Sequence, residues 1–304
     1  MSGRLLTDDQ LADLARPPAL TLVGLLERAD LGAVASWASS IQRCWQAAVR
    51  GYHDWIAHTQ AHLLDRHGPA ALAALAPATG SFFARHPDTA RSDGVDQAGR
   101  ERVLAAAARA DAASARQAFE DWAEPWRCLH DLHRDWLSDV LSHVYRTYGV
   151  DELEAAIRHA GEQTLLAWMP SDLARPPDKR IASWTRMLHG HFTVFDLTED
   201  DDKFTIVQDP CGSCTRQILQ GRYEPPVSLA MVDEPGLLTG GRGATPIYRT
   251  HVPVMHVAMP LARIGVPWPV NQCPAGAATG PCRILLFKDP YDPAAAAYLP
   301  SAAR

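Results

Sequence analysis

The chain has 304 residues, of which 47% are hydrophobic and 21% charged, and its formal net charge is −6. This composition is that of an ordinary globular protein, and the length exceeds one typical core, so we expect two domains. The negative charge and the lack of a basic block argue against a nucleic-acid partner, and no apolar run is long enough to span a membrane.

The first ten residues, MSGRLLTDDQ, are polar and acidic and lack the apolar stretch of a secretion signal. We therefore expect a cytoplasmic protein. Thiols stay reduced in that compartment, so the six cysteines are expected to serve as metal ligands, as a redox pair or as small buried residues.

The sequence of the N-terminal half predicts a series of helices. Thr7 and Gln10 form a capping-box pattern that starts the first short helix. Gly68 ends the long helix, because glycine readily adopts the left-handed conformation found after a helix. Expected helices after the first cover residues 20–28, 33–67, 69–76, 100–123 and 151–168, and residues 79–99 are expected to form a loop.

This helical pattern occurs twice. Residues Trp45, Trp55, Gly68 and Leu72 recur 81 positions later as Trp126, Trp136, Gly149 and Leu153. Four matches at one spacing predict an internal repeat, at about 33–76 and 114–157, that packs as a pseudo-symmetric bundle within a domain of residues 1–170. Leu141 lies in the apolar stripe of the second copy.

Histidines suggest one metal site in the helical half. His58 and His62 are four residues apart, and the repeat places Asp139 and His143 at the equivalent positions. If these faces meet, three imidazoles and a carboxylate would converge on an ion. The alternative is that all four are polar residues at the margin of the bundle.

The segment 170–179 is the predicted boundary, followed by a β-rich domain of residues 180–304. A short helix is expected at 181–188, a hairpin at 192–207 around an acidic turn, and strands at 252–259 and 283–288. Eleven prolines from Pro225 to Pro290 limit long central strands. The predicted fold is therefore α+β: a duplicated helical bundle followed by a small, irregular antiparallel β-rich domain.

The hairpin runs into Asp209-Pro210-Cys211-Gly212-Ser213-Cys214, a Cys-x-x-Cys turn that can present two thiolates to one ion. One predicted ligand set is Cys211, Cys214, Cys273 and Cys282, although the second pair is more widely spaced than in a usual zinc knuckle. The other combines Cys211 with His191, His251 and His256, and Cys214 is a further candidate. In a strand, His189 and His191 would share a face.

Two alternatives remain at this turn. Cys273 and Cys282 can be buried residues with the histidines on loops. The second alternative is a redox function for Cys211 and Cys214. A redox Cys-x-x-Cys normally lies at a helix N-terminus, and no amphipathic helix is expected to follow Cys214, which argues against this function.

Three segments, DPCGSCTR, YRTHVPVMH and PCRILLFKDP, resemble a loosely defined set of uncharacterised bacterial proteins with a DPCGSGG-type, metal-binding C-terminal region. That set carries DPCGSGGR, then Tyr-Cys-x-His-Cys, then Cys-Arg before a Lys-Asp-Pro ending. Here Cys211 and His251 are kept, and Arg249 and Val252 replace cysteines. The resemblance covers about the last 120 residues and implies a metal site without implying an activity.

The leading functional hypothesis is a metal-dependent enzyme with one zinc or non-haem iron ion held by Cys211, His251 and His256. A small-molecule substrate would bind between the domains, with Trp184, Trp268 and Tyr248 either as apolar wall residues or as core residues. The alternative is a ligand-sensing or adaptor protein with a structural zinc site, and a third is a helical protein without metal. The sequence identifies no catalytic residue and no oligomeric state.

Overall fold

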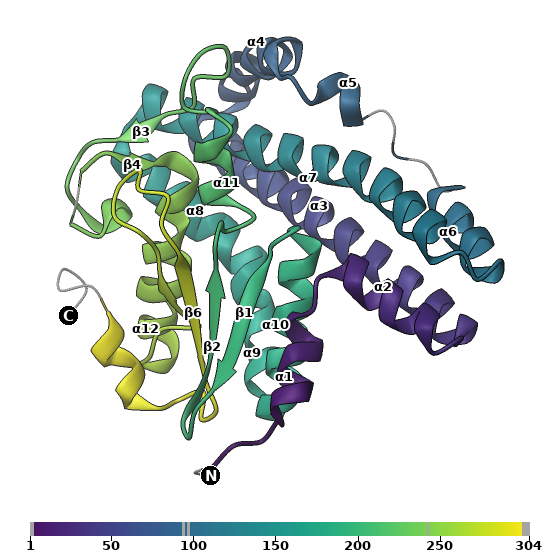
Figure 1. The fold of residues 1–304 in the computed structure, drawn as a ribbon. Helices are drawn as coiled ribbons and strands as arrows, with labels where there is room; N and C mark the ends of the chain where they lie inside the picture. Colours follow the sequence, from purple (N-terminus) through teal and green to yellow (C-terminus); the bar gives the residue numbers. More distant parts are fainter. Residues whose placement is uncertain (1–2, 93–94, 96–97, 242, 300–304) are drawn as a thin grey trace.

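The computed structural model describes residues 3–92, 95, 98–241 and 243–299. The fold is α+β, as predicted: a helical N-terminal region is followed by a region with a small antiparallel sheet (Figure 1). The helices are α1 (Asp8–Ala15), α2 (Pro18–Glu27), α3 (Leu31–His67), α4 (Pro69–Arg85), α5 (Thr89–Ser92), α6 (Ala98–Ala108), α7 (Ala112–Tyr148), α8 (Val150–Gln163), α9 (Leu165–Leu173), α10 (Pro177–Gly190), α11 (Cys214–Leu219) and α12 (Met259–Ile264).

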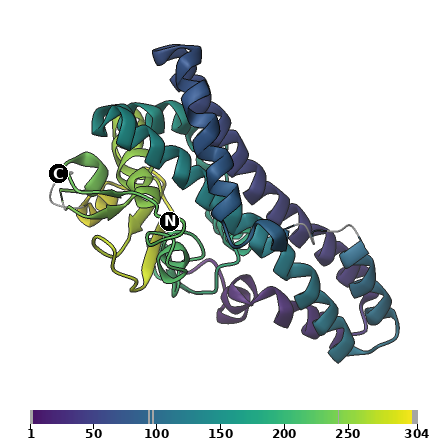
Figure 2. The ribbon, with the colours of Figure 1, turned by 90° about the horizontal axis from the view of Figure 1, so that it is seen from above.

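The two longest helices, α3 and α7, lie side by side and form the axis of the helical region (Figures 1 and 2). Their ends match. Asp30 and Asp111 cap them, each accepting a hydrogen bond from the backbone nitrogen three residues on. Gly68 and Gly149 end them with φ angles of 74° and 89°, a region that favours glycine. These pairs are each 81 positions apart and support a duplicated unit, whose limits of 33–76 and 114–157 stay predictions.

Helix α4 is longer than the sequence suggested. The chain stays helical through Pro77 and Gly80 to Arg85, so the first part of the expected loop at 79–99 is helix. Packing explains the difference, because α4 buries Leu75 and Phe82 on one face, and tertiary contacts outweigh the low helix propensity of proline and glycine. Residues 93, 94, 96 and 97 of the expected loop lie outside the described residues.

The main sheet has the order β1-β2-β6-β5, and all neighbouring strands are antiparallel. The predicted hairpin is confirmed: Phe195 pairs with Gln208 and Glu199 with Phe204. The predicted strand at 283–288 is also present, as β6. The strands are β1 (Phe195–Glu199), β2 (Lys203–Gln208), β5 (Val270–Gln272), β6 (Cys282–Phe287), and the separate pair β3 (Met231–Val232) and β4 (Thr245–Pro246).

Two local predictions in this region were wrong. Residues 252–259 form a π-helix, Val252–Ala258, that continues into α12, and not a strand. Four consecutive buried residues, 254–257, mimic a buried strand, and a short apolar run does not distinguish the two structures. His189 lies in α10 and His191 at its C-terminal cap, so they do not share the face of a strand.

One hydrophobic cluster contains residues from both predicted domains, including Leu141 of α7, Met255 of the π-helix and Ile284 of β6. Asp172, near the end of α9, accepts a hydrogen bond of 2.9 Å from Trp268 Nε1. The predicted boundary at 170–179 coincides with the end of α9 and the start of α10, and the division into residues 1–170 and 180–304 stays a prediction. No described helix combines the length and apolar character needed to cross a membrane.

Candidate functional site

The Cys-x-x-Cys turn leaves the end of β2 and leads directly into α11, which begins at Cys214. The helix after Cys214 was not expected from the sequence. Gly212 allows a close approach here, because a Cβ atom at this position would lie 2.2 Å from Thr193 Oγ1 and 2.3 Å from the His191 carbonyl oxygen. The Gly212 nitrogen donates to Thr193 Oγ1 at 3.1 Å. The turn therefore packs against His191 and Thr193, which directly follow α10.

Four cysteines gather at this turn. Cys282 begins β6 and pairs with the last residue of β2, and Cys273 directly follows β5, so the sheet brings both beside the turn. The thiol of Cys211 interacts with those of Cys214 and Cys282, and the thiol of Cys273 interacts with the same two. The first predicted ligand set is therefore assembled into one cluster, which we call the cysteine cluster.

The cysteine cluster is tightly packed. The sulfur atoms of Cys273 and Cys282 are 3.1 Å apart, whereas sulfurs around a tetrahedral zinc ion lie about 3.8 Å apart for Zn–S bonds of about 2.3 Å. Within the described part of the chain, no three His, Cys, Asp or Glu side chains are spaced as a ready metal-binding group. All four cysteines of the cluster are free thiols.

Arg249 lies against the cysteine cluster. Its guanidinium is buried, with Nη2 3.7 Å from the Cys214 sulfur. Its other hydrogen bonds go to the carbonyl oxygens of Pro274, Gly276 and Ala278. No carboxylate pairs with it among the residues that the structure describes, so the thiol sulfurs are the groups that can carry the compensating negative charge.

Hydrogen bonds from Cys211 and Cys273, together with the charge of Arg249, hold the pKa of Cys214 well below its usual value. The hydrogen bond to Cys214 raises the pKa of Cys211 to about 12, and the pKa of Cys273 is raised by the same partner. These contacts therefore favour the thiolate form of Cys214, which lies beside neighbouring thiols and a buried cation.

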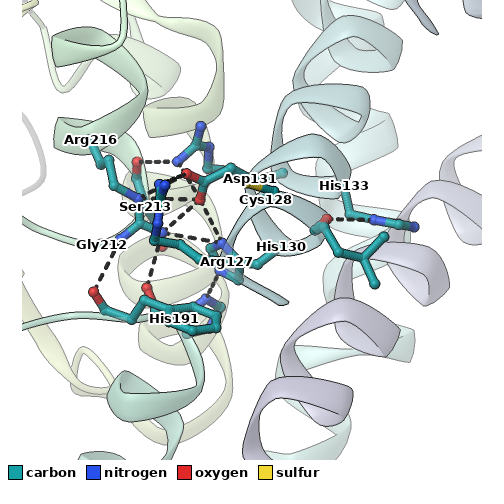
Figure 3. Close-up of polar contacts among 12 residues, drawn as sticks. Arg127, Cys128, His130, Asp131, His133, His191, Gly212, Ser213 and Arg216 are labelled. Atoms are coloured by element: carbon teal, nitrogen blue, oxygen red, sulfur yellow. Dashed lines mark hydrogen bonds and ion pairs between the residues drawn. The ribbon is translucent and has the colours of Figure 1, made fainter. Parts of the chain in front are cut away.

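A buried ion-pair network fixes the turn to α7 from the other side (Figure 3). Arg216 of α11 reaches Asp131 of α7, with Nη2 2.7 Å from Oδ1. Arg216 also donates to the carbonyl oxygens of His191 and Phe192. Arg134 of α7 donates to the Ser213 carbonyl oxygen at 3.4 Å. Asp131 is fully buried, so its partners must compensate its charge.

The charge states within this network follow from burial and pairing. Burial disfavours the Asp131 carboxylate, but Arg134, His130 and Arg216 outweigh that effect and hold its pKa well below the usual range. Burial lowers the pKa of His130 to about 4, although Asp131 lies 2.9 Å from its Nδ1. At neutral pH the network therefore contains an ionised Asp131 and a neutral His130.

The three histidines of the second predicted ligand set make their described hydrogen bonds to groups other than thiols. Burial lowers the pKa of the His251 imidazole, and Cys214 lies close enough for its sulfur to oppose that effect. His191 Nδ1 is 2.8 Å from His130 Nε2. His251 Nδ1 contacts the Tyr248 carbonyl oxygen, and His256 Nδ1 is 3.1 Å from that of Trp268. The rings of His251 and His256 are 5.7 Å apart. Among the described contacts, none of these imidazoles hydrogen-bonds to a thiol.

Of the second set, Cys211 alone belongs to the cysteine cluster, where it meets the further candidate Cys214, and the mixed cysteine–histidine site stays a prediction. The structure does not assemble the metal site predicted in the helical half. His62 Nε2 lies 2.8 Å from Glu152 of α8, whereas Asp139 and His143 face α4. The two faces do not meet, because α3 and α7 each turn this face toward a short neighbouring helix.

A cavity of about 670 Å³ adjoins the cysteine cluster, with Cys273 and Arg249 in its lining. Its walls come mainly from residues 235–241 and 271–276. All of its described lining belongs to residues 235–299, so it is not formed between the two halves of the chain. For the three residues that were expected either in the wall or in the core, the structure shows the core: Trp184, Tyr248 and Trp268 are buried in the hydrophobic cluster.

Sequence reasoning missed Arg249 and the pairing of Asp131 with Arg216. Position 249 was noted only as a departure from the resembled set, and the structure places its side chain against the thiol cluster. Asp131 and Arg216 are 85 positions apart, and no local pattern signals such a pair. Comparison of the chain with protein-family models, with curated proteins and with solved structures gives no match.

Proposed function

We propose that this protein is a ligand-binding protein with a structural metal site, in which the cysteine cluster holds one zinc or iron ion and the adjoining cavity takes a small molecule. One observation carries the metal assignment: four thiols from three chain segments meet beside a buried guanidinium that has no carboxylate partner among the described residues. Tetrahedral sulfur sites select zinc or iron.

The residues fit such an ion in number, type and charge. Four thiolates complete the tetrahedral shell of a structural zinc site, and the sulfurs need to separate by only about 0.7 Å from the 3.1 Å contact. A divalent ion with four thiolates has a net charge of −2, and Arg249 offsets half of it. A hydrogen bond from outside the shell to a ligand sulfur also stabilises the thiolate form.

The same shell favours the second functional hypothesis over the enzyme. A catalytic ion needs an open coordination position, and four protein thiolates leave none. The region around the cluster is irregular and has only short strands among the described residues. A metal there would join the turn after β2, the loop after β5 and the start of β6, which border the cavity.

The cavity suits an uncharged, mainly apolar ligand. Proline, leucine, valine and glycine dominate its lining, and uncharged polar groups come from Thr239, Thr245, Asn271, Gln272 and Tyr298. Arg249 is the single charged side chain in the described lining, and its guanidinium is already bonded to carbonyl oxygens and to Cys214. Apolar walls with a few polar groups are the usual composition of small-molecule pockets.

The test is elemental analysis of protein purified under reducing conditions without a metal-binding tag. We expect about one equivalent of zinc or iron per chain, as for a single tetrahedral site, and we expect chelation to destabilise the C-terminal region. Protein that holds no metal while its four cysteines stay reduced would refute the proposal, because oxidation would then not explain the loss of the ion. A mass measurement after alkylation distinguishes the free thiols from the disulfides.

A further inference from the structure

A second cavity, of about 210 Å³, lies between α4 and α7, well separated in the sequence from the cysteine cluster. Its lining residues are Ala78, Ser81 and Arg85 from α4, and Asp139, His143 and Arg146 from α7. The α7 residues are spaced by four and three positions, so they share one helix face. Extension of α4 beyond residue 76 supplies the opposite wall.

The internal repeat shows why this cavity exists. In the equivalent cleft between α3 and α8, His62 Nε2 lies 2.8 Å from Glu152, and the ring of His159 lies 5.4 Å from that of His62. The residues 81 positions before Glu152 and His159 are Ala71 and Ala78. One cleft is thus filled by a carboxylate and an imidazole, whereas two alanines leave space in the other.

The same change leaves buried polar atoms unsatisfied. His143, the equivalent of His62, has no hydrogen-bond partner for Nε2 in the described structure, and neither has Asp139 Oδ2. Asp139 is only 8% exposed. Unpaired buried polar atoms are unfavourable and mark positions where a bound group completes the hydrogen bonding.

The charge of the cleft is positive. Arg85 has no ion-pair partner in the described part of the chain, and the Arg146 guanidinium donates to one carbonyl oxygen, that of Ser228, at 2.7 Å. Burial lowers the pKa of His143, so this imidazole is neutral at pH 7.5. Burial raises the pKa of Asp139 to about 6, although Arg85 and Arg146 oppose that effect. Two cations therefore face one carboxylate.

We propose that this cleft binds a small oxyanion that carries a proton, with inorganic phosphate as the best representative. Arg85 and Arg146 would bind the charged oxygens, His143 would donate or accept a hydrogen bond, and the Asp139 carboxylate would accept the hydroxyl proton. Sulfate has no proton at neutral pH, so its oxygens would meet the lone pairs of Asp139 and it would bind more weakly.

Titration calorimetry at pH 7.5 with inorganic phosphate tests the proposal on the full chain. The variant Arg85→Gln should weaken phosphate binding by about tenfold or more, the usual effect of losing a charge-assisted hydrogen bond. The control Arg43→Gln removes an exposed arginine of α3 that does not line the cleft, so it should leave binding unchanged. Asp139→Asn should reduce the preference for phosphate over sulfate.

Saturable phosphate binding that Arg85→Gln weakens and Arg43→Gln does not would support the site. Absence of saturable binding at millimolar phosphate, or equal effects of the two arginine substitutions, would overturn it. Circular dichroism confirms that each variant is folded. The result is independent of the metal proposal, because Cys282→Ser should leave phosphate binding unchanged.

Discussion

Arg249 places Nη2 3.7 Å from the sulfur of Cys214, so a buried cation faces a thiol that has two further thiols as neighbours. Other hydrogen bonds of this guanidinium fix it to the loop that contains Cys273. The side chain therefore links two of the three segments that supply the cysteines, and it compensates charge at the cluster.

The first prediction concerns this contact. Arg249→Met removes the positive charge while keeping much of the side-chain volume, and metal affinity should fall by about 10- to 100-fold, the usual range for groups that support a metal ligand. Competition with a chromophoric zinc chelator measures the affinity. Arg283→Met, at an exposed position in β6, is the matched control and should leave the affinity unchanged.

Gly212 gives a prediction about the turn itself. Gly212→Ala should destabilise the protein by about 1–3 kcal/mol or more, because its methyl group would overlap Thr193 Oγ1 and the His191 carbonyl oxygen. Urea unfolding gives the free-energy difference. Gly51→Ala has open space around the new methyl group and lies within α3, so it should be neutral or stabilising by up to about 1 kcal/mol. Equal effects of the two substitutions would contradict the tight seating of the turn.

Stability should depend on pH through His130. Its pKa is about 4 in the folded protein and about 6.5 in the unfolded chain. Between these values the unfolded chain binds more protons, so the free energy of unfolding is highest above pH 6.5 and falls as the pH decreases toward 4. The full loss from this one group is about 3 kcal/mol at most.

His130→Gln should therefore flatten the decrease in stability between pH 6.5 and pH 4 relative to the unmodified protein. Denaturant unfolding at several pH values gives this comparison, and both proteins share every other titrating group. Identical pH profiles would show that His130 is protonated at the same pH in the folded and unfolded states.

The helical core provides a stability prediction that does not involve the site. Leu141 has no exposed surface, and Leu141→Ala should reduce the free energy of unfolding by about 2–5 kcal/mol. Leu219 is 61% exposed in α11, so Leu219→Ala should change stability by less than about 0.5 kcal/mol. Thermal and urea unfolding of the two variants measure both effects.

Local patterns predicted much of the fold. The capping box at Thr7, the paired glycines 68 and 149 and the hairpin at 195–208 depend on neighbouring residues, and all are present. The extension of α4 and the π-helix at 252–258 depend on tertiary packing, which the same residues do not reveal.

The candidate site was predictable in part for the same reason. Cys211 and Cys214 are local, whereas Cys273 and Cys282 join them only because β6 pairs with β2. The spacing of eight residues between Cys273 and Cys282 counted against them, although β5 and β6 bring the two sulfurs into contact. The buried partners Asp131 and Arg249 carry no sequence signal, since isolated charged residues are usually exposed.

Metal content in three single-substitution variants tests the central claim most directly. Elemental analysis of the untagged protein should give about one zinc or iron ion per chain, as expected for one tetrahedral site. Cys282→Ser should lose that ion, whereas Cys44→Ser, outside the cysteine cluster, and His256→Ala should keep it. Metal retained in Cys282→Ser but lost in His256→Ala would contradict the four-cysteine site and favour the mixed cysteine–histidine set.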